Sequence, residues 1–142
     1  MKVKELMSKQ VIRIRPEESV SVAARALTHY NVGVLPVCRE DGKVCGIVTD
    51  RDIVTRCLAA NRPPEQTTVG DIMTTQVYST KPDMDAGAAA HLMGRQQVRR
   101  LPVEENGYLC GMVSLGDLAN NSDCAYDAAD ALTEITGNIS SR

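Results

Sequence analysis

The sequence contains neither phenylalanine nor tryptophan, and its aromatic fraction is only 3% of 142 residues. The hydrophobic content of 43% is ordinary, so the core must be built from Val, Ile, Leu, Met and Ala. Proteins that bind single-stranded nucleic acid stack its bases on aromatic side chains, and such side chains are almost absent here. This shortage argues against a nucleic-acid partner.

An excess of charge of one sign is also lacking. Lys and Arg number 16, Asp and Glu number 18, and the formal net charge is −2 with a pI near 5.7. A surface dedicated to nucleic acid or anionic lipid would carry a basic excess. No apolar run approaches about 18 residues, and the opening Met1–Met7 has no signal-peptide apolar stretch. We therefore expect a cytoplasmic protein that binds neither membrane nor nucleic acid.

Cysteine and histidine do not form ligand patterns. The five cysteines are odd in number and contain no Cys-x-x-Cys pair, which argues against structural zinc and a secreted disulfide framework. Cys45 and Cys110 lie in apolar stretches, where a thiol packs as a small hydrophobe, but Cys38 and Cys45 flank one hairpin, so a redox bridge stays open. His29 and His91 have no partner at metal-ligand spacing. No nucleophile stands beside a base, so we expect no metal site and no enzyme.

What the chain does have is an internal repeat. Val3–Arg56 aligns with Val69–Asn121 with a single one-residue slip. Two copies are too few for a solenoid, so we expect two halves packed about a pseudo-twofold axis, with equivalent clefts between them. The predicted organisation is repeat 1 at 1–60, a linker at 61–68, repeat 2 at 69–121 and a tail at 122–142.

Each repeat is predicted to run β-α-β-β-α, which gives an α/β (α+β) fold. Asp41-Gly42 and Asn106-Gly107 are hairpin turn signals, and Ser19 and Asp85 are helix N-caps. Helical spacing in the tail predicts an extra helix that ends at Gly137 and covers a groove on its own or a partner subunit. The predicted strands are 10–14, 32–37 and 43–49 in the first repeat and 77–80, 98–103 and 108–114 in the second. The predicted helices are about 20–30, 50–59, 86–93 and 116–120.

The strongest local signal is a hydroxyl at the end of a strand with an acid three residues later. Thr49 and Asp52 form this pair in the first repeat, and Ser114 and Asp117 form it in the second. The spacing is that of a capping box, which would explain these residues without any ligand. The same geometry offers a phosphate the free N–H groups of a helix start, with a carboxylate nearby for a ribose diol. Both interpretations stay open at this point.

The segments around these pairs resemble a known family. Leu35-Pro36-Val37 precedes Gly46-Ile47-Val48-Thr49-Asp50-Arg51-Asp52, and Leu101-Pro102-Val103 precedes Gly111-Met112-Val113-Ser114-Leu115-Gly116-Asp117. Two such sets in register resemble a tandem pair of cystathionine-β-synthase (CBS) domains, the arrangement called a Bateman module. The resemblance covers about residues 3–121.

The resemblance implies clefts for adenosine-containing ligands. AMP, ADP or ATP are expected, with S-adenosylmethionine or NAD as further possibilities, and no cofactor is required. By position, the two acids would hold ribose hydroxyls and the two hydroxyls would contact phosphate, while Arg99 and Arg100 strengthen the second cleft for a phosphorylated ligand. The implied ligand-binding residues are Ile12, Val34, Leu35, Pro36, Thr49, Arg51, Asp52, Tyr78, Arg99, Arg100, Leu101, Pro102, Ser114 and Asp117.

The sequence is compatible with two functions. The first is a regulatory module that senses an adenine nucleotide and signals through its own homodimer or to an effector on another chain. The second is a structural or interaction CBS pair with empty clefts, which works through dimer surfaces or thiol chemistry. The residues alone do not decide between them.

Overall fold

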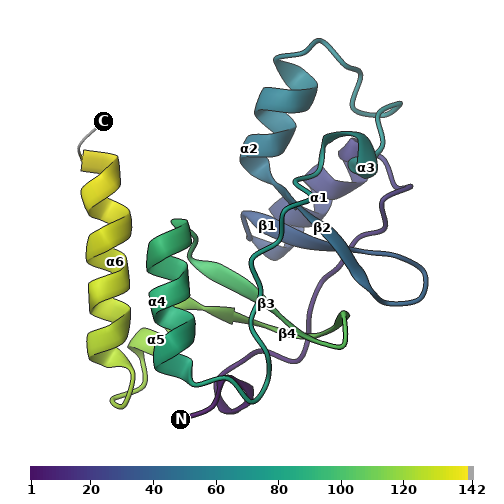
Figure 1. Ribbon diagram of the computed structural model, residues 1–142. Coiled ribbons are helices and arrows are strands. Elements are labelled where there is room, and N and C mark those ends of the chain that lie inside the picture. The colour runs from purple at the N-terminus through teal and green to yellow at the C-terminus, as the bar shows by residue number, and fades with distance from the viewer. Residues whose placement is uncertain (141–142) are drawn as a thin grey trace. The chain divides into compact units, whose positions relative to one another are not determined.

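The computed structural model describes residues 1–140, with side chains to residue 137, and it has the mixed α/β architecture that the sequence predicts (Figure 1). Two antiparallel hairpins form two separate two-stranded sheets, β1-β2 and β3-β4. The chain divides into two compact units, residues 12–77 and residues 1–11 with 78–142. The 12–77 unit holds α1 (Val20–Tyr30), β1 (Val34–Cys38), β2 (Val44–Thr49), α2 (Asp50–Asp52), η2 (Ile53–Leu58) and α3 (Val69–Ile72). The other unit holds η1 (Val3–Glu5), α4 (Ala86–Gln96), β3 (Arg100–Glu105), β4 (Tyr108–Ser114), α5 (Leu115–Ala119) and α6 (Ala125–Ser140).

The local signals fold as predicted. Asn106 and Gly107 turn the second hairpin with φ of 54° and 86°, the left-handed pair that a tight hairpin requires. Ser19 Oγ accepts a hydrogen bond from the Val22 amide, and Asp85 Oδ2 accepts one from the Ala88 amide, both at 3.2 Å. These caps start α1 and α4, the equivalent helices of the two repeats.

The predicted strands at 10–14 and 77–80 are wrong, because each is reduced to a single parallel bridge. Ile14 bridges Val37, and Thr80 bridges Val103. The Ile14 amide donates to the Pro36 carbonyl at 3.1 Å, and the Thr80 amide donates to the Pro102 carbonyl at 3.0 Å. The next rung of each ladder would need an N–H from that same proline, which has none. The proline of each Leu-Pro-Val segment therefore ends the pairing after one bridge.

Two helix predictions also need correction. The tail helix does not end at Gly137, since α6 continues to Ser140. A Cβ at Gly137 would meet nothing within 4 Å, and glycine costs a helix only about 1 kcal/mol, so nothing stops it there. The helix predicted at 50–59 is a three-residue α turn followed by a π-helical stretch, η2.

The boundaries of the compact units differ from those of the sequence repeats. The opening turn of each repeat belongs to the unit that contains the hairpin of the other repeat. Ser8 adds to β4, exchanging two backbone hydrogen bonds with Met112 at 2.8 and 3.0 Å. Thr74 adds to β2 in the same way, exchanging bonds with Ile47 at 2.8 and 2.9 Å. Every unit is thus built from both repeats.

Close contact between these turns and the sheets depends on one glycine in each unit. A Cβ at Gly46 would lie 2.7 Å from Met73 Sδ and 2.9 Å from the Thr74 carbonyl oxygen. A Cβ at Gly111 would lie 2.6 Å from the Ser8 carbonyl oxygen and 2.9 Å from Met7 Sδ. The repeated glycine is therefore a packing requirement.

The C-terminal helix packs on α4 of its own chain. Gly87 and Gly94 face it, and a Cβ at Gly94 would lie 3.2 Å from Ala131 Cα. His91 Nε2 lies 3.0 Å from Asp127 Oδ1, which adds a polar contact at the edge of the helix pair. Helix α6 thus covers a face of its own compact unit, as Figure 1 shows.

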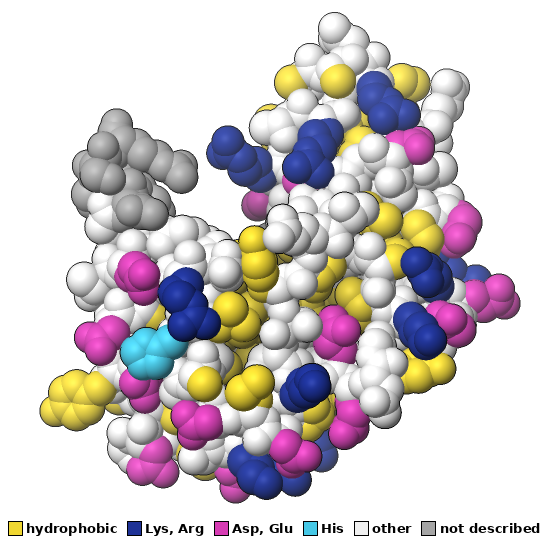
Figure 2. All heavy atoms as spheres, viewed as in Figure 1, with side chains coloured by type: hydrophobic (Ala, Val, Ile, Leu, Met, Phe, Trp, Pro, Cys, Tyr) yellow, Lys and Arg dark blue, Asp and Glu magenta, His cyan; other side chains and the backbone are white. Residues whose placement is uncertain are grey.

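Acidic and basic side chains are interspersed on the face drawn in Figure 2, with no large patch of one sign. Within residues 1–140, no helix is long and apolar enough to cross a bilayer.

Candidate functional site

Both hydroxyl–acid motifs form complete capping boxes at the junction of a strand and a helix. Thr49 Oγ1 accepts from the Asp52 amide at 3.0 Å, and Asp52 Oδ2 accepts from the Thr49 amide at 3.0 Å. Ser114 Oγ accepts from the Asp117 amide at 3.0 Å, and Asp117 Oδ2 accepts from the Ser114 amide at 2.9 Å. The capping interpretation is therefore correct for both motifs. A ligand would have to bind the hydrogen-bonding atoms that the caps do not use.

The two acids differ in what else binds them. Asp52 is only 6% exposed, and both its oxygens accept from Thr74 Oγ1 at 3.2 Å. Arg56 Nη1 lies 3.5 Å from Asp52 Oδ1 and adds an ion pair. The Asp52 carboxylate is thus held from several sides within its own unit.

Asp117 is half-buried, and its Oδ1 has no hydrogen-bond donor among the residues that the structure describes. Ser8 is the repeat equivalent of Thr74, but its hydroxyl bonds the Gln10 carbonyl at 3.4 Å instead. Asn121 stands where the first repeat has Arg56. One oxygen of the second carboxylate is therefore free to accept a hydrogen bond from a bound molecule.

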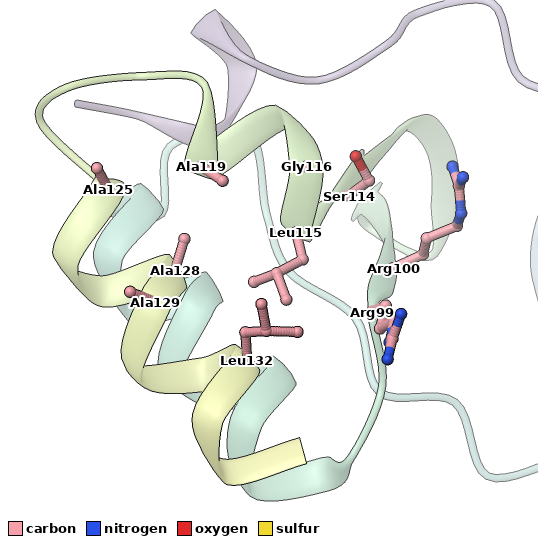
Figure 3. Close-up of a pocket in the computed structure, with 10 residues that line it drawn as sticks. All are labelled: Arg99, Arg100, Ser114, Leu115, Gly116, Ala119, Ala125, Ala128, Ala129 and Leu132. Carbon is pink, nitrogen blue, oxygen red and sulfur yellow. The ribbon is translucent and has the colours of Figure 1, made fainter. Parts of the chain in front are cut away.

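A hollow of about 500 Å³ opens beside the second motif (Figure 3). The two exposed arginines at the start of β3, Arg99 and Arg100, stand on one side of it, and α6 forms the other wall. The side chains of Leu115 and Leu132 point toward one another across the hollow. Its complete lining is Arg99, Arg100, Ser114, Leu115, Gly116, Ala119, Ala125, Ala128, Ala129 and Leu132.

The structure thus brings together three of the predicted site residues, Arg99, Arg100 and Ser114, around the hollow. Asp117 lies in the first turn of α5 and is not among the residues that line it. The tail helix was predicted to cover a groove, but none of its residues was predicted to line the site. The helical spacing of Ala125, Ala128 and Leu132 could have indicated it, but that spacing equally suits a helix packed only on its neighbour. Helix α6 reaches this hollow because it packs on α4, and the periodicity does not specify that packing.

The other predicted residues lie on the strands and their flanks. The side chains of Leu35 and Leu101 are buried in the cores of their own units, so they could offer a ligand only their backbone. Pro36 and Pro102 are buried, and their carbonyls already accept the amides of the single parallel bridges. Partly buried Ile12 and Tyr78 pack against the two cores, Val34 is partly buried at the start of β1, and Arg51 is exposed on α2.

None of the five cysteines, all within the described residues, forms a disulfide in the structure. Burial raises the pKa of the Cys45 thiol, and burial likewise raises the pKa of Cys124. A redox-sensing cysteine needs the opposite shift, toward thiolate. Within residues 1–140, no group of three or more His, Cys, Asp or Glu side chains is arranged to hold a metal ion.

Comparison with known proteins decides the family. The CBS domain family matches residues 3–59 and 69–123, which are the two sequence repeats. The chain belongs to the CBS domain family. It is a CBS pair, and CBS pairs are regulatory ligand-binding modules.

Individual relatives match most of the length of this CBS pair. It is 40% identical over 134 residues to the CBS domain-containing protein YhcV of Bacillus subtilis, covering 94% of both chains. The crystal structure of Hypoxic Response Protein I, which has two coordinated zinc ions, is similar with a TM-score of 0.79 at 30% identity, covering 85% of this chain and 98% of that one.

A third relative has a ligand of the expected class. The CBS pair of protein MJ0100, in complex with 5′-methylthioadenosine and S-adenosyl-L-methionine, is similar with a TM-score of 0.74 at 30% identity. The match covers 84% of this chain and 93% of that one.

Proposed function

We propose that this CBS pair is a regulatory protein that senses an adenosine-containing ligand, with its principal site at the second motif. Asp117 would accept hydrogen bonds from the ribose hydroxyls, and Ser114 with Arg99 and Arg100 would contact phosphate. The observation that carries the proposal is the free Oδ1 of Asp117, whose capping-box partner Ser114 lines a hollow together with two arginines. A carboxylate oxygen without a donor is the acceptor that a ribose diol needs.

The first motif, Thr49 with Asp52 and Arg51, is proposed as a weaker site. A ribose there would compete with the Thr74 hydroxyl and the Arg56 guanidinium for a buried carboxylate. Replacing two good partners by one ligand gives little net free energy. We therefore expect unequal affinities at the two motifs.

AMP, ADP and ATP are the proposed ligands, because exposed arginines favour a phosphorylated molecule and would give an energy-sensing function. S-adenosylmethionine and NAD are the alternatives, and the MJ0100 complex supports the former. Binding would signal only through a difference in ligand affinity between two states of the protein. We propose that a homodimer in the cytoplasm, or an effector protein, reads that difference, and that no catalysis takes place.

The test is the thermal midpoint of the reduced protein, alone and with each of these five compounds. A ligand at about a hundred times its dissociation constant stabilises the native state by about 2.7 kcal/mol, which is a shift of several degrees. Asp117→Asn keeps an oxygen for the cap but alters the acceptor, so it should remove the shift, and Asp52→Asn should retain most of it. No shift with any compound, or equal loss in both variants, would reject the proposed site.

A further inference from the structure

The hollow at the second motif is more apolar than a nucleotide phosphate requires. Its two sides differ in Figure 3: Arg99 and Arg100 stand on one side, and the Ala and Leu side chains of α5 and α6 form the other. Leu115 and Leu132 point toward one another across the space between. A phosphate would pair with the arginines and leave the apolar part of the hollow without a function.

Neither side of the hollow belongs to the repeated pattern. Arg99 and Arg100 stand where the first repeat has a glycine and a valine. Helix α6 begins at Ala125, beyond the end of the CBS family match at residue 123. In the other unit η2 leads into the 61–68 linker, so α1 has no counterpart of α6. Two features that are not shared by the repeats therefore meet at one hollow.

The α6 wall of the hollow offers no partner to a polar molecule. Ala128, Ala129 and Leu132 have no hydrogen-bonding side chain, and the backbone groups of this part of α6 bond one another within the helix. The polar edge of a purine or a sugar buried here would lose its hydrogen bonds to water without replacement, which costs free energy. An aliphatic chain loses no hydrogen bond and gains free energy by leaving water. This wall therefore suits an aliphatic group.

The opposite side of the hollow indicates the charge of its occupant. Among the side chains that the structure describes, neither Arg99 nor Arg100 has an acidic partner within ion-pair distance. Ser114 Oγ accepts the Asp117 amide at 3.0 Å, and its hydroxyl proton is still available to a further acceptor. Two guanidinium groups and a hydroxyl donor suit a carboxylate or a phosphate.

We propose that the hollow binds an aliphatic anion, a single hydrocarbon chain with a carboxylate or phosphate head group. The head group would bind Arg99, Arg100 and Ser114, and the chain would lie between Leu115 and Leu132 along α6. The proposal does not depend on nucleotide binding. Because the anion would use the arginines assigned above to nucleotide phosphate, the two ligands would exclude one another at this site.

The charge of α6 favours a free molecule over a lipid in a bilayer. From Ala125 to Ser140 the helix contains three acidic residues and no Lys or Arg. An anionic membrane surface attracts basic segments and would repel this one. The occupant is therefore expected to enter the hollow from solution.

The test is calorimetric titration of the full-length protein with sodium decanoate and with decyl phosphate, below the concentrations at which they form micelles. We expect saturable binding of one molecule per chain, and the tighter compound identifies the head group. Octanoate, which is shorter than decanoate by two methylenes, should bind about tenfold more weakly. Decyltrimethylammonium, which has the same chain length and a cationic head, should not bind.

Variants assign the binding to the hollow. Arg99→Ala and Arg100→Ala should each weaken decanoate binding by about tenfold, the scale of a hydrogen bond to a charged group. Leu132→Asp places a carboxylate beside the chain and should abolish binding, while the ligand-free variant keeps its thermal midpoint because Leu132 is 43% exposed. Thr133→Asp adds the same charge one residue further on, outside the lining of the hollow, and should retain binding.

Four outcomes would overturn the proposal. The first is the absence of saturable binding of both anions. The second is equal affinity for decyltrimethylammonium, which would mean unspecific apolar contact. The third is equal loss of binding in Thr133→Asp, which would mean general repulsion by α6. The fourth is sedimentation of the protein with phosphatidylglycerol vesicles that Leu132→Asp abolishes, since a membrane surface would then be the occupant.

Discussion

Thr74 donates its hydroxyl to both carboxylate oxygens of Asp52, at 3.2 Å each, across 22 residues of sequence. The bond joins the opening turn of the second repeat to the motif of the first. The repeat equivalent of this pair, Ser8 and Asp117, makes no such bond. Together with the Arg56 ion pair to Asp52, this difference occupies both oxygens of the first carboxylate and leaves the second with a free acceptor.

The first prediction concerns that bond. Thr74→Val should lower the free energy of unfolding by about 1–3 kcal/mol, because a buried carboxylate loses a donor. Ser8→Ala should change it little, because its hydroxyl makes only a long, exposed bond to the Gln10 carbonyl. Urea denaturation of both variants measures the difference, and equal effects would mean that Thr74 does not support Asp52.

The second prediction concerns the glycines under the exchanged turns. Gly111→Ala should destabilise the protein by about 1–3 kcal/mol, because the added methyl meets the Ser8 carbonyl and overpacks the junction. Gly116→Ala is the matched control, since its nearest atom would lie at 3.7 Å. Thermal unfolding compares them, and hydrogen exchange should show that residues 1–11 lose protection first in Gly111→Ala. Unchanged protection there would contradict the packing argument.

The third prediction concerns the docking of α6. Gly94→Leu should displace the helix, since a Cβ already comes within 3.2 Å of the Ala131 backbone. The repeat-equivalent change Thr28→Leu, on the uncovered face of α1, should be nearly neutral in the isolated protein. Limited proteolysis compares the two variants, and we expect early cleavage in α6 only in Gly94→Leu. Early cleavage in both variants would show that the effect is not specific to the helix pair.

The fourth prediction is a pH dependence. Since burial raises the pKa of the Cys45 thiol, its thiolate fraction is smaller than that of a free cysteine at every pH below that pKa. The folded variant in which the other four cysteines are Ser should therefore react slowly with a disulfide reagent at neutral pH, and its rate should rise only at higher pH than for the unfolded chain. A fast reaction at neutral pH would instead favour a thiol-regulated protein.

Much of this protein is determined locally by its sequence. The Asn106-Gly107 turn, the caps at Ser19 and Asp85 and the two capping boxes depend on contacts within a few residues, so their spacing predicts them. The duplication also identifies the family from the sequence, because both motifs occur twice in register. These features do not depend on how distant segments of the chain pack.

Only the tertiary structure decides how the nearly equal parts combine. The two repeats carry the same apolar pattern, so sequence alone does not tell that Met7 packs over Gly111 and Met73 over Gly46, nor that Thr74 reaches Asp52. The single-bridge strands likewise follow from a proline opposite them in space, not from their own residues. Long-range packing therefore decides which acid can bind a ligand and which helix face stays uncovered. A local sequence pattern does not predict this outcome, because both repeats carry the same pattern and could make the same contacts.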